Sequence, residues 1–211
     1  RSSGAFPAPQ RMTCNMSAIG DFELDRLDWD GPVLVAPGLR GSGDQHWQSL
    51  WERRFPQFRR VQQDDWSTPD LNGWARRIVE TALQFDEPVL VIAHSFGCLA
   101  TVKAETFQSN LIAGALLVAP ANPERFDAGR SLPRAPLLFP STVVASSDDP
   151  WMPLHAARDW AEHWGSEFVD LGPRGHINAD SGLGEWGEGR ALLRRLCRRL
   201  NRPAPPLRLR A

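Results

Sequence analysis

One serine, two adjacent aspartates and one histidine stand along the chain in an order that suits nucleophilic catalysis. Ser95 comes first and His176 comes last, with Asp148 and Asp149 between them. A serine hydroxyl is a weak nucleophile until a neighbouring base takes its proton, and that base needs a carboxylate to orient it. The residue types and their order therefore predict acyl transfer from an ester or amide through a covalent acyl-enzyme.

The segment around Ser95 has the pattern of a nucleophile elbow. Its sequence, AHSFG, follows the apolar run VLVI and opens a predicted helix. Such a strand-turn-helix is so tight that the residues two before and two after the serine must be small, and Ala93 and Gly97 meet that requirement. Backbone N–H groups at the start of the helix can then stabilise an oxyanion. Ala93 stands where the usual pattern has glycine, so an ordinary strand-to-helix turn is the alternative.

The candidate acid and base each follow a predicted strand. Asp148 and Asp149 come after the strand expected at 142–145, and His176 comes after the strand expected at 167–171. Because the carboxyl ends of parallel strands share one rim of a sheet, we expect these side chains to converge there with the serine. Residue chemistry does not distinguish Asp148 from Asp149. Three other histidines lack such a position and are expected at the surface or in helix packing: His46, His155 and His163.

Short β-branched runs alternate with stretches of helical period, which is typical of a parallel sheet covered by helices. Strands are expected at 33–36, 59–63, 89–93, 113–119, 142–145 and 167–171. Helices are expected at 46–54, 69–85, 96–107, 154–164 and 185–200. The nearly continuous apolar strands indicate that both faces are covered. We predict a three-layer α/β fold with a mostly parallel six-stranded sheet in the order 2-1-3-4-5-6 and helices on both faces.

The helix expected at 69–85 carries its own start signals. Ser67 or Thr68 can cap it, and Pro69 fits its first turn, where the missing N–H costs nothing. Its apolar residues recur at helical spacing, so one face is expected to meet the sheet.

Length and composition favour one ordinary domain. Of the 211 residues, 42% are hydrophobic and 23% charged. We expect a loose arm at 1–30, one α/β domain at 31–201 and a disordered tail at 202–211. The apolar runs fall well short of the about 18 to 20 residues of a membrane span, and the first 30 residues lack a signal-like stretch. The three cysteines show no metal-ligand spacing, which favours a reducing, cytoplasmic setting without a metal.

The charges nearly cancel over the whole chain. The 24 basic and 25 acidic residues leave a formal net charge of −1, so no general attraction to nucleic acid or membranes is expected. Eight arginines against two glutamates lie from residue 185 onward, and we expect most of them on the solvated face of the last helix. Tyr is absent and Lys103 is the only lysine, which excludes mechanisms that need a tyrosine or several lysines.

Residues 32 to about 200 resemble the small cap-less serine hydrolases of the α/β-hydrolase superfamily that are related to retinoblastoma-binding protein nine and bacterial YdeN. The resembling segments are VLVAPG at 33–38 with the later pair HW, AHSFG at 93–97, SDDPWMP at 147–153, and the pair GH that ends at residue 176. The resemblance implies that Ser95 is the nucleophile and His176 the base. The second aspartate of the DDP element, Asp149, would be the acid.

The resemblance also implies where an oxyanion is held. We assign the backbone N–H groups of Leu39 and Phe96 to the oxyanion hole, with Gly38 allowing close approach of the backbone. Trp66 and Trp151 follow strands on the reactive rim and are expected to line an apolar substrate pocket together with Met152. Five other tryptophans at helical spacing are expected to pack on the sheet: Trp47, Trp51, Trp74, Trp160 and Trp164. Short connections leave little material for a lid and predict an open site. We expect small esters or amides as substrates, and the mechanism implies no metal or organic cofactor.

Two other function classes compete with hydrolysis. A nucleotide binder would use the glycine-rich turn after the first strand and the acidic pair Asp64 and Asp65. The glycines read G-x-x-G-x-G rather than G-x-G-x-x-G, and no P-loop lysine follows, so this class is not favoured. A hydrolase-like interaction module without catalysis, using the arginine-rich end, is the second alternative. A complete triad would be unnecessary in such a module.

Overall fold

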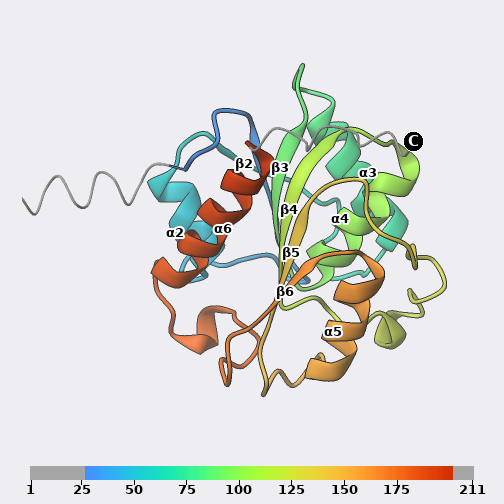
Figure 1. The fold of residues 1–211 in the computed structure, drawn as a ribbon, viewed down its shortest axis with the longest axis vertical. Helices are drawn as coiled ribbons and strands as arrows, with labels where there is room; N and C mark the ends of the chain where they lie inside the picture. Colours follow the sequence, from blue (N-terminus) through green and yellow to red (C-terminus); the bar gives the residue numbers. More distant parts are fainter. Residues whose placement is uncertain (1–26, 202–211) are drawn as a thin grey trace, which may run out of the picture.

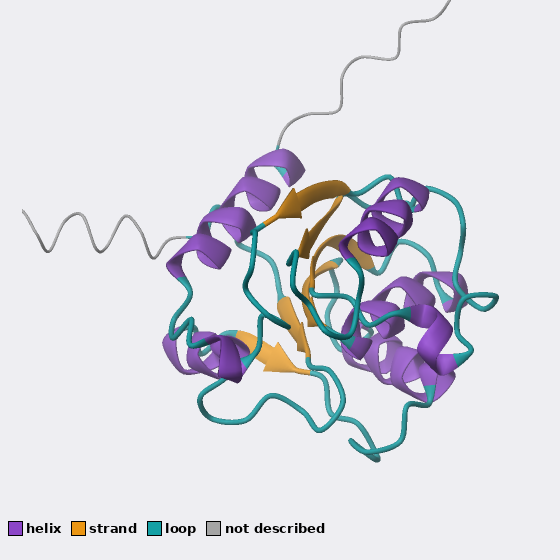
Figure 2. Ribbon diagram, turned by 90° about the horizontal axis from the view of Figure 1, so that it is seen from below, coloured by secondary structure: helices purple, strands orange, loops and turns teal. Residues whose placement is uncertain are grey.

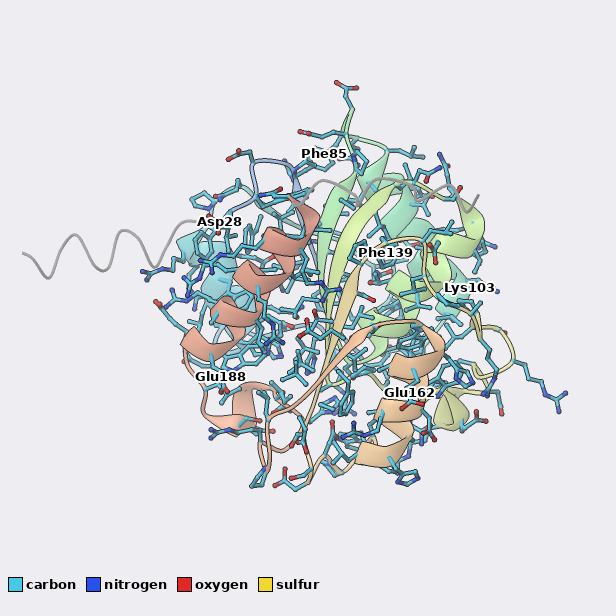
Figure 3. The ribbon with its side chains drawn as sticks, viewed as in Figure 1. Asp28, Phe85, Lys103, Phe139, Glu162 and Glu188 are labelled. Atoms are coloured by element: carbon cyan, nitrogen blue, oxygen red, sulfur yellow. The ribbon has the colours of Figure 1, made fainter. Side chains whose placement is uncertain are left out.

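The computed structural model of this chain describes residues 27–201 (Figure 1). The expected tail at 202–211 and residues 1–26 of the expected arm lie outside the described residues. Of the arm residues that are described, Leu27 is buried in the hydrophobic core. Asp28, which lies beside the last helix (Figure 3), accepts a hydrogen bond from Arg198 at 2.9 Å. Leu27 and Asp28 therefore lie against the domain.

Six parallel strands form one sheet in the order β2-β1-β3-β4-β5-β6, which confirms the predicted topology. The strands are β1 Val33–Ala36, β2 Phe58–Arg60, β3 Val89–His94, β4 Ile112–Val118, β5 Ser141–Ala145 and β6 Glu167–Asp170. At their carboxyl ends Ala36 pairs with Ala93, and His94 pairs with Val118. The loops that leave β1, β3, β4 and β5 therefore all start at the carboxyl-terminal end of the sheet.

Helices cover both faces of the sheet (Figure 2). They are α2 Trp47–Arg54, α3 Leu71–Ala82, α4 Phe96–Phe107, α5 Leu154–His163 and α6 Gly187–Leu200, with short 3-10 helices η1 Pro123–Phe126 and η2 Ala179–Ser181. Helices α2 and α6 pack on one face, and α3, α4 and α5 pack on the other (Figure 1). Alternate strand residues supply the two cores: Val91 and Leu117 face α3 to α5, whereas Leu90 and Leu116 face α2 and α6.

Strand β2 is shorter than predicted. The expected strand at 59–63 is observed as Phe58–Arg60, because β2 lies at the edge of the sheet and pairs, among the described residues, with β1 alone. The Val61 N–H still donates to the Val35 carbonyl at 2.9 Å, and the chain then leaves the sheet. The other five strands match their predicted ranges to within one residue.

The predicted start of α3 is wrong. Asp70 is the N-cap, and its side chain accepts a hydrogen bond from Gly73 N at 3.0 Å. The hydroxyls of Ser67 and Thr68 instead donate to the carboxylate of Asp65, at 2.6 and 2.5 Å. Because that carboxylate holds both hydroxyls, neither one caps the helix, and Pro69 precedes the cap rather than entering the first turn.

The carboxyl ends of the strands are open in the described part of the chain. The connection from β4 to β5 contains η1 as its only helix, and residues 27–201 include no separate cap domain. No helix within this range is both long and apolar enough to cross a membrane.

Candidate active site

Ser95 joins the end of β3 to the start of α4 in a strained conformation. Its φ of 55° and ψ of −122° lie in a region that residues with a side chain seldom adopt. A Cβ atom at Gly97 would collide with the carbonyl oxygens of Ala36 and Pro37, so a glycine is required there. Ala93 is fully buried on the other side of the turn. Steric crowding by Ala36 and Pro37 thus explains the glycine two residues after this serine.

Three side chains from three loops meet at this turn. The His176 Nε2 atom lies 2.9 Å from Ser95 Oγ. Its Nδ1 atom lies 3.0 and 2.9 Å from the two carboxylate oxygens of Asp149, whose side chain is 2% exposed. Because the carboxylate can only accept, Nδ1 carries the proton, and Nε2 is left to accept the hydrogen bond of the serine hydroxyl. The arrangement can remove a proton from Ser95.

The adjacent aspartates have different contacts. Asp148 accepts hydrogen bonds from Ser146 Oγ and from Gly175 N, both at 2.7 Å. These two hydrogen bonds, that from Ser146 first, lower the pKa of Asp148 below its usual value. Asp148 thus fastens the loop that carries the histidine, whereas Asp149 contacts the imidazole itself. This answers the question that residue chemistry left open, in favour of Asp149 as the imidazole's partner.

Two buried rings hold the backbone of the loop that carries His176. The His94 Nε2–H donates to the His176 carbonyl at 2.9 Å, and the Trp47 Nε1–H donates to the Ile177 carbonyl at 2.8 Å. Ile177 is fully buried with φ of 47°, a strained value for a β-branched residue. Burial lowers the pKa of His94 well below its usual value, so the ring is neutral. The two donors hold the strained backbone in place.

His46 was expected at the surface or in helix packing, and its position in the cavity wall was missed. It is buried, and it caps α2 through Nδ1, which accepts from Gln48 N at 3.2 Å. Burial, with smaller contributions from the charges of Arg60 and His176, lowers its pKa from 6.5 to about 4. Its ring lies edge-on to His94, with centroids 4.7 Å apart. In the sequence, only its place beside Trp47 in the glycine-rich loop could have drawn attention to it.

The loop after β1 is fastened close to the serine. A Cβ atom at Gly38 would lie 2.7 Å from Ser95 Cβ, so only glycine permits this approach. The buried Gln48 side chain accepts from Ser42 Oγ at 2.6 Å and donates to the Ile92 carbonyl at 3.0 Å. Leu39, in the same loop, lines the cavity at Ser95. The second residue expected at the oxyanion hole, Phe96, is the first residue of α4 and has a fully buried ring.

A cavity of about 610 Å³ opens at Ser95 and His176. Of the three side chains expected in its wall, Trp151 lines it and is 54% exposed. Trp66 and Met152 do not line it. The Trp66 ring packs edge-on against the Trp74 ring, with centroids 5.5 Å apart, and Met152 is buried in the core. Both side chains therefore pack within the protein instead of facing the cavity. Several polar wall residues were not anticipated from the sequence: Arg40, Asn122, Arg125, Asn178 and Asp180.

No group of three or more His, Cys, Asp and Glu side chains that could hold a metal ion occurs within residues 27–201. The buried thiols of Cys98 and Cys197 are free, and burial raises the pKa of both, that of Cys197 to about 12. Neither thiol belongs to the cavity wall.

Comparisons with known proteins give one family and one fold. The model of the serine hydrolase family matches residues 33–195. A YdeN-like hydrolase from Pectobacterium atrosepticum is 40% identical with a TM-score of 0.80, covering 85% of this chain and 97% of that chain. The ydeN gene product from B. subtilis is 19% identical with a TM-score of 0.64, covering 78% of this chain and 97% of its own. A thermophilic esterase from Thermogutta terrifontis is 13% identical with a TM-score of 0.63, with coverages of 82% and 91%. At these lower identities the last two likenesses concern the fold alone, and no curated protein sequence matches the chain.

Proposed function

We propose that this chain, which belongs to the serine hydrolase family, cleaves small carboxylic esters or amides through an acyl-enzyme. The resemblance to YdeN-like α/β-hydrolases that the sequence motifs suggested is confirmed by the family match and by the 40% identical relative. The observation that carries the proposal is the chain of contacts from Asp149 through His176 to Ser95 at 2.9 to 3.0 Å. Those contacts join a nucleophile, a base and an orienting carboxylate at the mouth of a cavity.

In the proposed reaction Ser95 Oγ attacks the substrate carbonyl carbon while its proton moves to His176 Nε2. Asp149 holds the Nδ1–H and stabilises the imidazolium that forms. The tetrahedral intermediate collapses when His176 returns the proton to the leaving oxygen or nitrogen, which leaves an acyl group on the serine. A water molecule, deprotonated by the same imidazole, then attacks the acyl group, and the carboxylic acid departs as Ser95 regains its proton.

The negative charge that develops on the carbonyl oxygen needs donors on the side away from His176. We assign this role to the backbone N–H groups of Leu39 and Phe96. Support comes from the close approach of Gly38 to Ser95 and from the position of Phe96 at the positive end of α4. Donors held rigidly in this way cost no reorganisation when the charge forms.

The rival reading, an interaction module that uses the arginine-rich end, has less support. Within α6, Arg195 and Arg199 both bind Glu167 at 2.6 Å, and Arg198 binds Asp28. These arginines fasten the helix to β6 and to the start of the domain. They are therefore engaged within the domain itself.

Labelling with a fluorophosphonate probe tests the proposed function. The wild-type protein is expected to be labelled and to turn over members of a panel of chromogenic esters and aminoacyl amides, whereas Ser95→Ala should do neither. The proposal is wrong if the folded wild-type protein takes up no probe and cleaves no member of the panel. The panel also decides between esters and amides.

A further inference from the structure

The side chains of the cavity wall present more hydrogen-bond donors than acceptors. Asn122 and Asn178 cap η1 and η2, and each side-chain oxygen accepts from a backbone N–H, of Glu124 and Asp180 respectively, at 3.1 Å. Because the two oxygens accept these bonds, the NH₂ groups are the free ends of the amides, and neither has a hydrogen-bond partner within residues 27–201. Both amides therefore offer donors to a ligand in the cavity.

His46 adds a buried donor to the same wall. Its Nδ1 accepts from Gln48 N, so the proton of the neutral ring sits on Nε2. The residue is only 5% exposed, and its buried Nε2 atom has no hydrogen-bond partner in the described part of the chain. An unsatisfied buried donor is costly unless a ligand or solvent oxygen reaches it.

Two arginines give the wall a positive charge. The guanidinium of Arg125 lies 5.0 Å above the Trp151 ring, and that ring lies 6.5 Å from the ring of His176. Arg40 follows Leu39 directly in the loop after β1. No carboxylate lies within 4 Å of either guanidinium among residues 27–201. Among residues 27–201, Asp180 is the only carboxylate residue in the cavity wall, so that wall carries two arginines and one carboxylate.

We propose, on the basis of the function proposed above, that the substrate carries a carboxylate a few carbon atoms from the scissile carbonyl, and that Arg125 and Arg40 bind it. Arg125 is the main determinant, because its contact with Trp151 keeps the guanidinium near the reacting atoms. A guanidinium matches a carboxylate in charge and in its planar arrangement of donors. The NH₂ groups of the two asparagines and His46 Nε2–H bind the remaining oxygens of the substrate.

Pairs of esters that differ in one charge test this inference. The first pair is monoethyl glutarate, which carries its charge on the acyl side, and its uncharged amide, ethyl 4-carbamoylbutanoate. The second pair is 4-acetoxybutanoate, which carries its charge on the alcohol side, and its own amide. In at least one pair, kcat/KM for the charged ester should exceed that for the amide by about five- to tenfold, and the ratio should fall as salt is added. Alkyl esters avoid the self-cleavage of activated half-esters.

Arg125→Gln should bring that ratio close to one, while the matched control Arg158→Gln should leave it unchanged. Arg158 also lies over an aromatic ring, at 4.4 Å from the centroid of Phe168, but it is outside the cavity wall. A ratio measured within one protein cancels losses of folded enzyme. The inference is overturned if neither charged ester is preferred, or if the preference survives in Arg125→Gln.

A binding measurement keeps this inference separate from the proposed function. Calorimetric titration of Ser95→Ala with monoethyl glutarate and with 4-acetoxybutanoate should show binding of at least one of these esters, and the added Arg125→Gln change should weaken that binding by about the same factor. If the wild-type protein takes up no fluorophosphonate and cleaves no member of the panel, but this binding is found, the catalytic proposal is wrong and the carboxylate site stands. If Ser95→Ala binds the glutarate ester and its amide equally, and the acetoxybutanoate pair equally as well, the carboxylate site is wrong.

Discussion

The support beneath the histidine loop and the exposed rim of the cavity are built in different ways. On the side of the histidine loop, buried donors of His94 and Trp47 hold consecutive carbonyls, and Asp149 is almost completely enclosed. At the rim of the cavity, by contrast, the side chains of Arg125 and Trp151 are exposed, and Arg125 has no carboxylate partner in the described residues. Chemistry that depends on fractions of an ångström requires the first kind of construction. Recognition of a substrate from solvent requires the second.

This contrast predicts how strongly each substitution lowers kcat. A change in the triad or in the buried residues that support it should affect the chemical step more than a change at the exposed rim. The largest loss is expected from Ser95→Ala or His176→Gln. Either change should lower kcat by about 10⁴ to 10⁶, because nucleophile and base act as one unit. Ester turnover at saturating substrate measures it.

His155→Gln is the matched control for the histidine change, because His155 is exposed on α5 and lies outside the cavity wall. It should retain wild-type turnover. A His176→Gln protein that keeps more than a hundredth of the wild-type kcat would remove the imidazole from the proposed mechanism.

The adjacent aspartates give the next largest contrast. Asp149→Asn should lower kcat by about 10³ to 10⁴, because the amide no longer enforces the imidazole tautomer that the serine needs. Asp148→Asn should lower kcat by less than about tenfold and act mainly on Tm, since Asp148 contacts the loop and not the ring. Steady-state kinetics with thermal unfolding of both variants separates the two effects. Inactive Asp148→Asn beside fully active Asp149→Asn would reverse the assignment.

His94 tests whether the buried donors position the histidine loop. His94→Phe fills the space of the ring but removes the donor to the His176 carbonyl, so kcat should fall by about 10- to 100-fold with little change in KM. His94→Gln can still donate and should recover part of this loss. The pH profile of kcat should change in the Phe variant and return towards wild type in the Gln variant.

Tm of the two His94 variants is the control for folding. Equal kcat values for the Phe and Gln proteins, or an effect confined to KM, would show that His94 is only a packing residue.

The smallest effect is expected at His46, in the pH dependence of the free energy of unfolding. Its pKa is about 4 in the folded protein and 6.5 when exposed, so the unfolded chain binds the proton more tightly. Above pH 6.5 His46 is neutral in both states and does not lower the free energy of unfolding. As pH falls from 6.5 towards 4, the unfolded state takes up the proton first, and the free energy of unfolding falls by roughly 3 kcal/mol at most. Urea unfolding at several pH values between 4 and 7.5 measures the slope.

His46→Asn isolates that titration, because asparagine keeps the capping of α2 and cannot take up a proton. The free energy of unfolding should then depend less on pH below 6.5 than in the wild-type protein, whereas the exposed-residue control His155→Gln should leave the slope unchanged. An unchanged slope in His46→Asn would show that His46 does not resist protonation in the folded state.

Local patterns explain which parts of the molecule could be predicted. The strand order, the helix positions and the elbow at Ser95 follow from apolar runs and from the need for small residues beside a tight turn. Those signals lie within a few residues of each other along the chain. The start of α3 was wrong because Asp65 takes the hydroxyls of Ser67 and Thr68, a local competition that residue preferences alone do not rank.

The amino-acid order was sufficient for the sheet, the elbow and the set of residues that could serve as nucleophile, base and acid, because each depends on short-range periodicity and on strands ending at one rim. Contacts between distant segments settled the rest. Asp149 rather than Asp148 reaches the imidazole, Trp151 rather than Trp66 or Met152 lines the cavity, and His46 faces it. In each case neighbouring or similar side chains differ only in direction, and that direction is set by packing against residues far away in the chain.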